Sequence, residues 1–193
     1  MSNLKIEPEL KIEPTQPIPK IFDLTLLKPV KVENEKSIGK TKISYENKGQ
    51  YIGPYTNNKK NGNGELILPN NDRYIGKFNN DLFDGKGVYT WANGEKYEGD
   101  FKNGNFHGKG KIEYGNGHFY DGDWFNGIRN GKGIEIFENG NKYEGDYFNG
   151  VIEGKGKMIF KNNDVYTGTF HQGQRQGKGE KNLQMEDYIS VTR

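Results

Sequence analysis

The stretch YEGDFKNGNFHGKGKIEYGNGHF, residues 97–119, is one unit of a pattern that repeats through most of the chain. Six units can be aligned, and each opens 23 residues after the one before it. The opening residues are Tyr51, Tyr74, Tyr97, Tyr120, Tyr143 and Tyr166. In every unit a glycine follows the tyrosine after one residue, an aromatic residue follows that glycine in the same way, and Gly-x-Gly occupies positions twelve and fourteen. A spacing without a slip across six units indicates a true internal repeat.

Each unit is predicted to be a hairpin of two antiparallel strands. The Tyr-x-Gly-x-aromatic segment and the segment that begins at Gly-x-Gly both alternate with period two, as strands do. Asn-Gly pairs close units two to four, at residues 93–94, 116–117 and 139–140, and Asn-Gly is typical of type I′ hairpin turns. Six units therefore predict about twelve strands in one sheet, which at ~4.8 Å per strand would extend on the order of 55 Å.

The composition fits a sheet with little aliphatic core. Only 31% of the residues are hydrophobic and the mean hydropathy is -1.00, yet 13% are aromatic and 28 are glycine. An aromatic ring that lies over a cross-strand glycine replaces the packing that the glycine lacks, so one layer of sheet can stabilise itself. Units this small are expected to share their stability with their neighbours.

The pattern closely resembles the MORN repeat (membrane occupation and recognition nexus), from Tyr51 to about Leu183. The resemblance implies an all-β fold, an elongated single-layer twisted antiparallel β-meander of about six hairpins over residues 51–183. It also implies a non-catalytic role, either in cytoskeletal and ciliary scaffolds such as a radial-spoke head or in linking proteins to membranes. We expect residues 1–50 to form an extended, proline-containing docking arm, and residues 184–193 to be a C-terminal tail or cap.

Several classes of function are not indicated by the sequence. A net charge of +2 gives no basic footprint for nucleic acid, and the absence of cysteine excludes thiol chemistry and disulfides. The first ten residues lack the apolar core of a signal peptide, and no apolar run is long enough to span a membrane, so a cytoplasmic protein is expected. His107, His118 and His171 occupy three different unit positions, and therefore neither a metal, a cofactor nor a catalytic site is expected.

A row of lysines lies between the paired glycines of units two to six. The row consists of Lys86, Lys109, Lys132, Lys155 and Lys178. The Gly-Lys-Gly element is not a nucleotide-binding P-loop, because it recurs in five units and no helix pattern follows it. If position four of a unit faces position thirteen across its own hairpin, Asp100 would pair with Lys109, and units four and five would repeat the pair. Lys86 and Lys178 would then lack an acidic partner and are the candidate lipid-binding residues.

Apolar residues stand where the two strands of a unit connect, a place that is usually polar in the family. They are Leu82, Phe83, Phe106, Ile128, Val151 and Ile152. They either fold back over their own hairpins or form an apolar edge that a partner protein covers. Glu135 stands where the other central units carry an apolar residue, which means either a local shift of unit four or a specific contact.

The N-terminal segment carries a second set of candidate contacts. Ile6, Leu10 and Ile12 alternate with charged residues and are punctuated by proline, which favours an extended arm that orders on a partner or along the sheet. Three tetrapeptides, LKIE at 4–7, LKIE at 10–13 and VKVE at 30–33, resemble acceptor sites for the small ubiquitin-like modifier SUMO.

Together these features predict a non-catalytic structural or adaptor subunit that contacts other protein subunits of a larger, cytoskeletal or axonemal (ciliary) assembly. The alternative is a peripheral membrane adaptor that binds anionic phospholipids through the lysine row. An enzyme is a distant third reading, because no catalytic domain fits in the chain.

Overall fold

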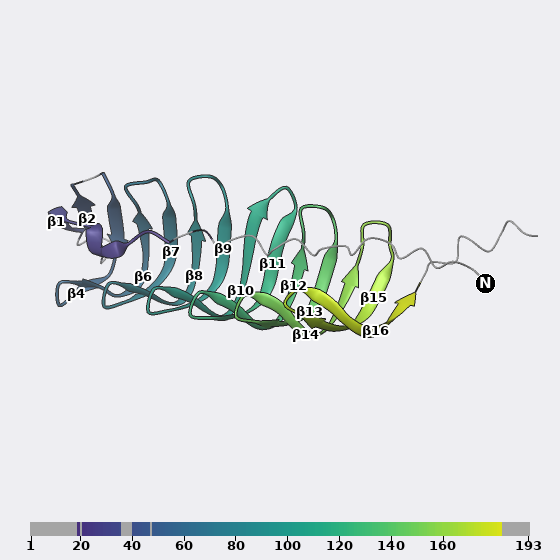
Figure 1. The fold of residues 1–193 in the computed structure, drawn as a ribbon. Coiled ribbons are helices and arrows are strands. Elements are labelled where there is room, and N and C mark those ends of the chain that lie inside the picture. Colours follow the sequence, from purple (N-terminus) through teal and green to yellow (C-terminus); the bar gives the residue numbers. More distant parts are fainter. Residues whose placement is uncertain (1–18, 20, 36–39, 47, 183–193) are drawn as a thin grey trace, which may run out of the picture.

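The computed structural model describes residues 19, 21–35, 40–46 and 48–182. Their backbone forms one long antiparallel sheet of 14 strands, whose order in space follows the order of the chain (Figure 1). The sheet stays open, and β1 and β16 are its two edges. The prediction of an all-β antiparallel meander is therefore confirmed.

The strands of the large sheet fall into those that precede the repeats and those of the six units. The first group is β1 (Pro29–Glu35) and β2 (Lys40–Tyr45). The units contribute β3 (Gln50–Gly53), β6 (Gly62–Ile67), β7 (Arg73–Asn79), β8 (Leu82–Thr90), β9 (Lys96–Lys102), β10 (Asn105–Gly115), β11 (His118–Phe125), β12 (Ile128–Ile136), β13 (Lys142–Phe148), β14 (Val151–Ile159), β15 (Val165–His171) and β16 (Gln174–Asn182). A small separate hairpin pairs β4 (Tyr55–Thr56) with β5 (Lys59–Lys60), and the 3-10 turn η1 (Leu24–Leu26) precedes β1.

Each unit bends where its Gly-x-Gly begins. In unit three, Asp100 of β9 pairs with His107 of β10, and the pairing resumes between Gly99 and Gly110, so Gly108 and Lys109 form a bulge. Gly108 has a φ of 59°, which a residue with a Cβ rarely adopts. Repeated bulges turn the lower half of the sheet away from the upper half, and the two halves enclose a concave inner face (Figure 1).

The inner face is built on the tyrosine that opens each unit. Tyr97 lies over Gly99 and Gly110, and a Cβ placed on Gly110 would come within 2.5 Å of the ring carbon Cζ. The hydroxyl of Tyr97 donates to the carbonyl oxygen of Asp100 at 2.9 Å, and the ring of Phe106 stacks on it at 3.8 Å between centroids. The prediction that rings cover paired glycines is thus confirmed.

Rings of neighbouring units also contact each other, which joins the units into one core. Four edge-to-face contacts have centroids 5.0 to 5.5 Å apart, and they repeat from unit two to unit six. These pairs are Tyr74 with Phe101, Tyr97 with Trp124, Tyr120 with Tyr147, and Tyr143 with Phe170. Since each unit buries its rings partly against the next, stability is shared along the array.

The predicted placement of the type I′ turns is largely wrong. Asn116 and Gly117 both have positive φ, but at 93–94 and 139–140 only the glycine does. The regular two-residue turns lie instead inside the units, where Asn103-Gly104, Asn126-Gly127 and Asn149-Gly150 have positive φ at both residues. The chain has Asn-Gly at both kinds of connection, so the dipeptide alone does not distinguish them.

The sheet begins before the first repeat. The hairpin of β1 and β2 adds two strands ahead of β3, so the sheet has more strands than the repeat count suggested. Residues 21–27, which precede β1, pack against the core on the inner face. There the backbone N–H of Phe22 donates to the Tyr89 hydroxyl at 3.2 Å. The candidate contacts Ile6, Leu10 and Ile12 lie outside the described residues.

Candidate functional site

The apolar residues at the strand connections divide between the two faces of the sheet. Phe83, Phe106 and Ile152 are almost fully buried in the core. Phe83 stacks on Tyr74 with 3.8 Å between centroids, as Phe106 does on the tyrosine of its own unit. Of the two alternatives, these three residues fold back over their own hairpins and do not form an exposed edge, because alternation along a strand sends the tenth residue of each unit inward.

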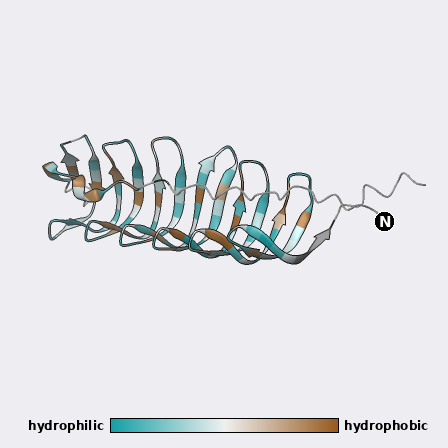
Figure 2. Cartoon of the chain, in the orientation of Figure 1, coloured by the Kyte–Doolittle hydropathy of each residue, from teal (hydrophilic) through white to brown (hydrophobic). Residues whose placement is uncertain are grey.

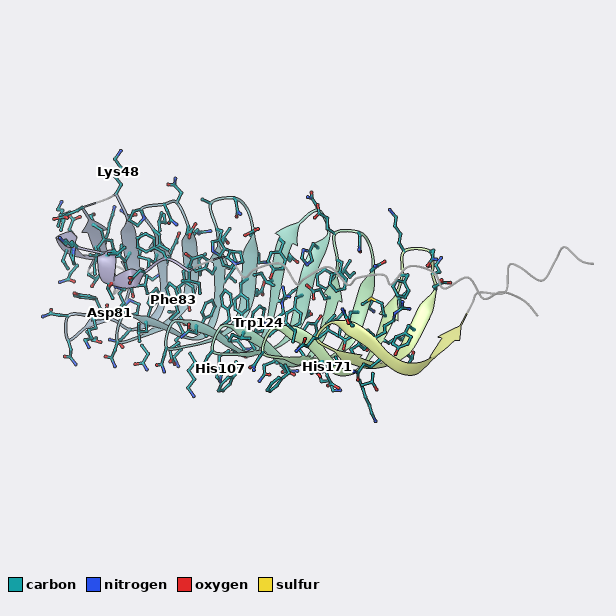
Figure 3. All side chains as sticks on the ribbon, in the orientation of Figure 1. Lys48, Asp81, Phe83, His107, Trp124 and His171 are labelled. Atoms are coloured by element: carbon teal, nitrogen blue, oxygen red, sulfur yellow. The ribbon has the colours of Figure 1, made fainter. Side chains whose placement is uncertain are left out.

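The ninth residue of each unit points outward, and in units four and five it belongs to an apolar patch. Phe125 pairs with Ile128, and Phe148 pairs with Val151, at the ends of adjacent hairpins. These four side chains are 55%, 44%, 58% and 41% exposed, in that order. We call them the outer apolar patch. Figure 2 shows brown segments in this lower part of the ribbon, and Figure 3 shows rings projecting from it near His107.

Polar residues border the outer apolar patch on both sides. Lys102 and Asn105 occupy the same two positions in unit three, and His171 and Gln174 occupy them in unit six. Leu82, which is also exposed, lies in unit two and is separated from the patch by unit three. The patch is thus a local feature of units four and five.

Sequence reasoning missed half of this patch. Phe125 and Phe148 each come directly after the aromatic residue at position five of their unit, and the repeat pattern does not distinguish them from it. A signal was present, because the same position is polar in the other units. Those residues are Thr56, Asn79, Lys102 and His171.

A buried polar network on the inner face explains the position of Glu135. This carboxylate accepts a hydrogen bond from the Tyr147 hydroxyl at 2.8 Å and lies 3.2 Å from both Arg129 Nη1 and His118 Nε2. Arg129 also donates to the Tyr114 hydroxyl at 2.6 Å. Burial raises the pKa of the Tyr147 hydroxyl well above its ordinary value, and the neighbouring carboxylate raises it further.

The network replaces an apolar contact of the other units without moving the backbone. Glu135 stays in register with Tyr120 and Tyr143, so unit four is not shifted and the alternative of a specific contact is confirmed. The guanidinium of Arg129 lies over the Tyr120 ring at 5.0 Å, where Phe106 lies over Tyr97 in unit three. Burial acts to lower the pKa of Arg129, but Glu135, Tyr114 and Tyr147 together more than offset this effect and hold the pKa above its usual range.

The lysine row is paired differently from the prediction. Lys109 Nζ lies 2.7 Å from Asp123 in the next unit, and Lys86 Nζ lies 2.9 Å from Asp100 in the same manner. The bulge displaces Lys109 from the aspartate of its own hairpin, so the only group of Lys109 that donates to Asp100 is its backbone N–H, at 3.2 Å. Lys86 is therefore paired, which contradicts the expectation that it lacks an acidic partner.

Towards the C-terminal end of the lysine row, fewer acidic residues neutralise the lysine charges. Lys155 faces Thr169, and no ion pair joins Lys155 to a carboxylate among the described residues. Lys155 and Lys157 border an open trough of about 900 Å³ on the outer face, which Thr167, Thr169 and two acidic residues, Asp121 and Glu144, also line. The side chain of Lys178 lies outside the described part of the chain.

Metal and membrane-spanning features are not found in the part of the chain that the structure describes. No group of three or more histidine and acidic side chains converges there in a way that could hold a metal ion. No helix of the described residues is long and apolar enough to cross a bilayer.

Comparisons with solved structures give weak likenesses. The TCP domain of Drosophila melanogaster SAS-4, in complex with a proline-rich motif of Ana2, is 14% identical with a TM-score of 0.48, over 79% of this chain and 88% of that one. The wild-type TCP10 domain of Danio rerio CPAP, in complex with a STIL peptide, is 10% identical with a TM-score of 0.21, over 72% of this chain and 83% of that one.

Comparison at the level of sequence is more decisive. No curated protein matches the chain. The family model of the MORN repeat, in contrast, matches six consecutive segments, at 51–73, 74–96, 97–119, 120–142, 143–165 and 166–181. These segments begin at the six tyrosines that organise the inner face, and they cover more than half of the sequence. The chain therefore belongs to the MORN-repeat family.

Proposed function

We propose that this protein is a non-catalytic adaptor that binds a partner protein through the outer apolar patch of units four and five. The observation that carries the proposal is the exposure of Phe125, Ile128, Phe148 and Val151 on adjacent hairpins. Contiguous apolar surface on a protein of low hydropathy marks an interaction site more often than it serves the fold.

The repeat itself does not require apolar residues at these positions. Unit three places Lys102 and Asn105 there and keeps the same strand pairing as unit four. The apolar residues are also separate from the core, since their side chains lie on the face opposite the tyrosines. Two exposed aromatic rings on adjacent hairpins are well suited as the anchors of an interface.

A matched pair of variants tests this proposal. Phe125→Lys with Phe148→Lys gives units four and five the residue that unit three carries, while Lys102→Ser alters an equivalent position outside the patch. Isolation of the native complex should recover the partner with the wild type and the control but not with the double variant. Thermal unfolding should be nearly the same for all three. Retention of the partner by a folded double variant would contradict the proposal.

The type of assembly is a finer proposal. We infer a cytoskeletal or axonemal (ciliary) location within the cytoplasm, and the support for it is the family resemblance alone. Imaging of a tagged protein in its own cells tests it, and a purely diffuse distribution in cells with an intact cytoskeleton would contradict it.

A peripheral membrane adaptor is the second candidate. The support for it is the trough beside Lys155 and Lys157, where the lysine row lacks one acidic partner. Co-sedimentation with vesicles that contain anionic lipid separates the two candidates. Salt-sensitive binding that Lys155→Glu with Lys157→Glu abolishes, and that the phenylalanine variants leave unchanged, would favour this second function.

The N-terminal segment remains a proposed additional contact. Ile6, Leu10 and Ile12 can be tested by deletion of residues 1–18, which leaves the packed segment 21–27 and all strands of the sheet in place. If the segment contacts the partner, the truncated protein should bind it more weakly. Unchanged affinity would remove these residues from the site.

A further inference from the structure

We propose that Lys31, on the edge strand β1, is an acceptor site for the small ubiquitin-like modifier. A conjugating enzyme would recognise four consecutive residues in an extended backbone: a large apolar residue, the lysine, any residue, and an acidic residue. This function is independent of the outer apolar patch, which lies in units four and five.

Sequence singles out this lysine among those that the structure describes. Val30 precedes Lys31, and Glu33 follows it after one residue. No other lysine of the described residues has both a large apolar residue directly before it and a carboxylate two positions after it. The complete tetrapeptide therefore occurs once in the described part of the chain.

The structure presents the tetrapeptide in the form that such an enzyme needs. The four residues lie within β1, which pairs with β2 alone and forms one edge of the sheet. Val30 and Val32 are 60% and 49% exposed, and the side chains of Lys31 and Glu33 are 64% and 45% exposed. An edge strand is open to another protein along its free side, whereas a strand inside a sheet is not.

Other lysines of the repeats supply internal comparisons. Lys96, Lys111 and Lys142 also have a glutamate two residues later, and each lies near that glutamate on the outer face. Their strands, β9, β10 and β13, are paired on both sides. The residues directly before them are Glu95, Gly110 and Asn141, none of which has a large apolar side chain. They carry the acidic half of the motif without the apolar residue and without a free edge.

The reaction requires the ion pair of the site to open. Lys31 Nζ lies 2.7 Å from Glu33, and exposed pairs of this kind contribute little to stability, so an enzyme can separate them at small cost. The co-reactant is the modifier held as a thioester on the cysteine of the conjugating enzyme. The ammonium of Lys31 first loses one proton to solvent. The neutral Nζ then attacks the thioester carbonyl, the C–N bond forms, the C–S bond breaks, and the cysteine sulfur leaves as thiolate. The second proton, which Nζ loses as the isopeptide forms, passes to that thiolate and gives the free thiol.

Reconstituted conjugation tests the proposal on the full-length chain. The reaction contains activating enzyme, conjugating enzyme, ATP and the modifier, and the substrate carries Lys5→Arg and Lys11→Arg to remove the two similar tetrapeptides. We expect a single adduct, mapped to Lys31 by mass spectrometry of the branched peptide. Adding Lys31→Arg should abolish it and Glu33→Gln should reduce its rate severalfold, whereas Lys111→Arg should leave it unchanged.

These variants keep the sheet intact, because Lys31→Arg retains the charge and the side chains are exposed. Absence of any adduct on the Lys5→Arg, Lys11→Arg protein would overturn the proposal. So would an adduct that persists after Lys31→Arg, or a rate that Glu33→Gln does not change.

Discussion

Units three and four have the same backbone and opposite choices of side chain on both faces. Inside, unit three stacks Phe106 on Tyr97, whereas unit four places Arg129 over Tyr120 and pairs it with Glu135. Outside, unit three carries Lys102 where unit four carries Phe125. In both cases the strand pairing and the bulge at Gly-x-Gly persist.

The comparison separates what the repeat requires from what it permits. The tyrosine and its two glycines set the backbone, because the ring occupies the space that a Cβ would need. The positions around them can vary if each change is compensated. Inside, a cation requires a carboxylate, since a lone buried charge is costly. On the outer face, the fold requires only that a side chain be compatible with water. An exposed apolar residue there therefore indicates contact with a partner.

The largest effect should come from the tyrosines that both units share. Burial raises the pKa of Tyr97 and Tyr120 above that of a free tyrosine, and it has the same effect on Tyr74 and Tyr143, which open units two and five. The unfolded chain releases these protons near pH 10, whereas the folded chain retains them. The contribution of these tyrosines to stability is therefore fully present below about pH 10. Above that pH the free energy of unfolding falls by about 1.4 kcal/mol per tyrosine for each pH unit.

Urea unfolding between about pH 8 and pH 11 measures this slope. Tyr97→Phe removes one titrating group and should make the loss shallower, although it also lowers stability at neutral pH through the lost hydrogen bond to Asp100. An unchanged slope in the variant would mean that the ring hydroxyls do not control alkaline unfolding.

Breaking the buried pair of unit four should have the next largest effect. Glu135→Leu leaves the guanidinium of Arg129 buried without its carboxylate, and such a loss costs about 3–5 kcal/mol. Arg129→Phe together with Glu135→Ile copies the Phe106 and Ile112 of unit three and should recover most of that stability. Chemical denaturation of the three proteins measures the difference. A double variant no more stable than Glu135→Leu would show that the two units are not interchangeable inside.

A methyl group under the tyrosine ring should cost about 3 kcal/mol in either unit, the upper end for overpacking. Gly110→Ala would press against Tyr97, and Gly133→Ala would press against Tyr120, in nearly the same geometry. Gly117→Ala controls for backbone strain alone, because its φ is 78° and no atom lies within 4 Å of the added carbon. It should cost about 1 kcal/mol. Equal unfolding free energies for all three would argue against the ring as the cause.

The smallest effect concerns the outer charges. Lys109→Glu should lower the unfolding free energy by about 1 kcal/mol or less, because its pair with Asp123 is exposed. A double-mutant cycle should find coupling between the side chains of Lys109 and Asp123 but none between those of Lys109 and Asp100. Coupling to Asp100 instead would support the ion pair within one hairpin that the sequence predicts and that the structure contradicts.

The candidate site was only partly accessible from the sequence. Ile128 and Val151 mark the connections of units four and five as unusual in the sequence, but the same pattern includes Phe106, which is buried. Which residues of a connection face outward depends on the bulge and on the turn, and the repeat alone does not specify either. It is the cross-strand pairing of Phe125 with Ile128 that assigns Phe125 to the patch.

The sequence by itself determined the fold class, the six units and the role of tyrosine over glycine, because these follow from spacing and from the volume of side chains close along the chain. Only the tertiary structure decided the partners across strands. The bulge at Gly108 moves Lys109 from Asp100 to Asp123, and the inward turn of Arg129 brings it to Glu135. Such contacts depend on register between strands, which a shift of one or two residues changes completely, whereas the periodicity that predicts the strands is unaffected by it.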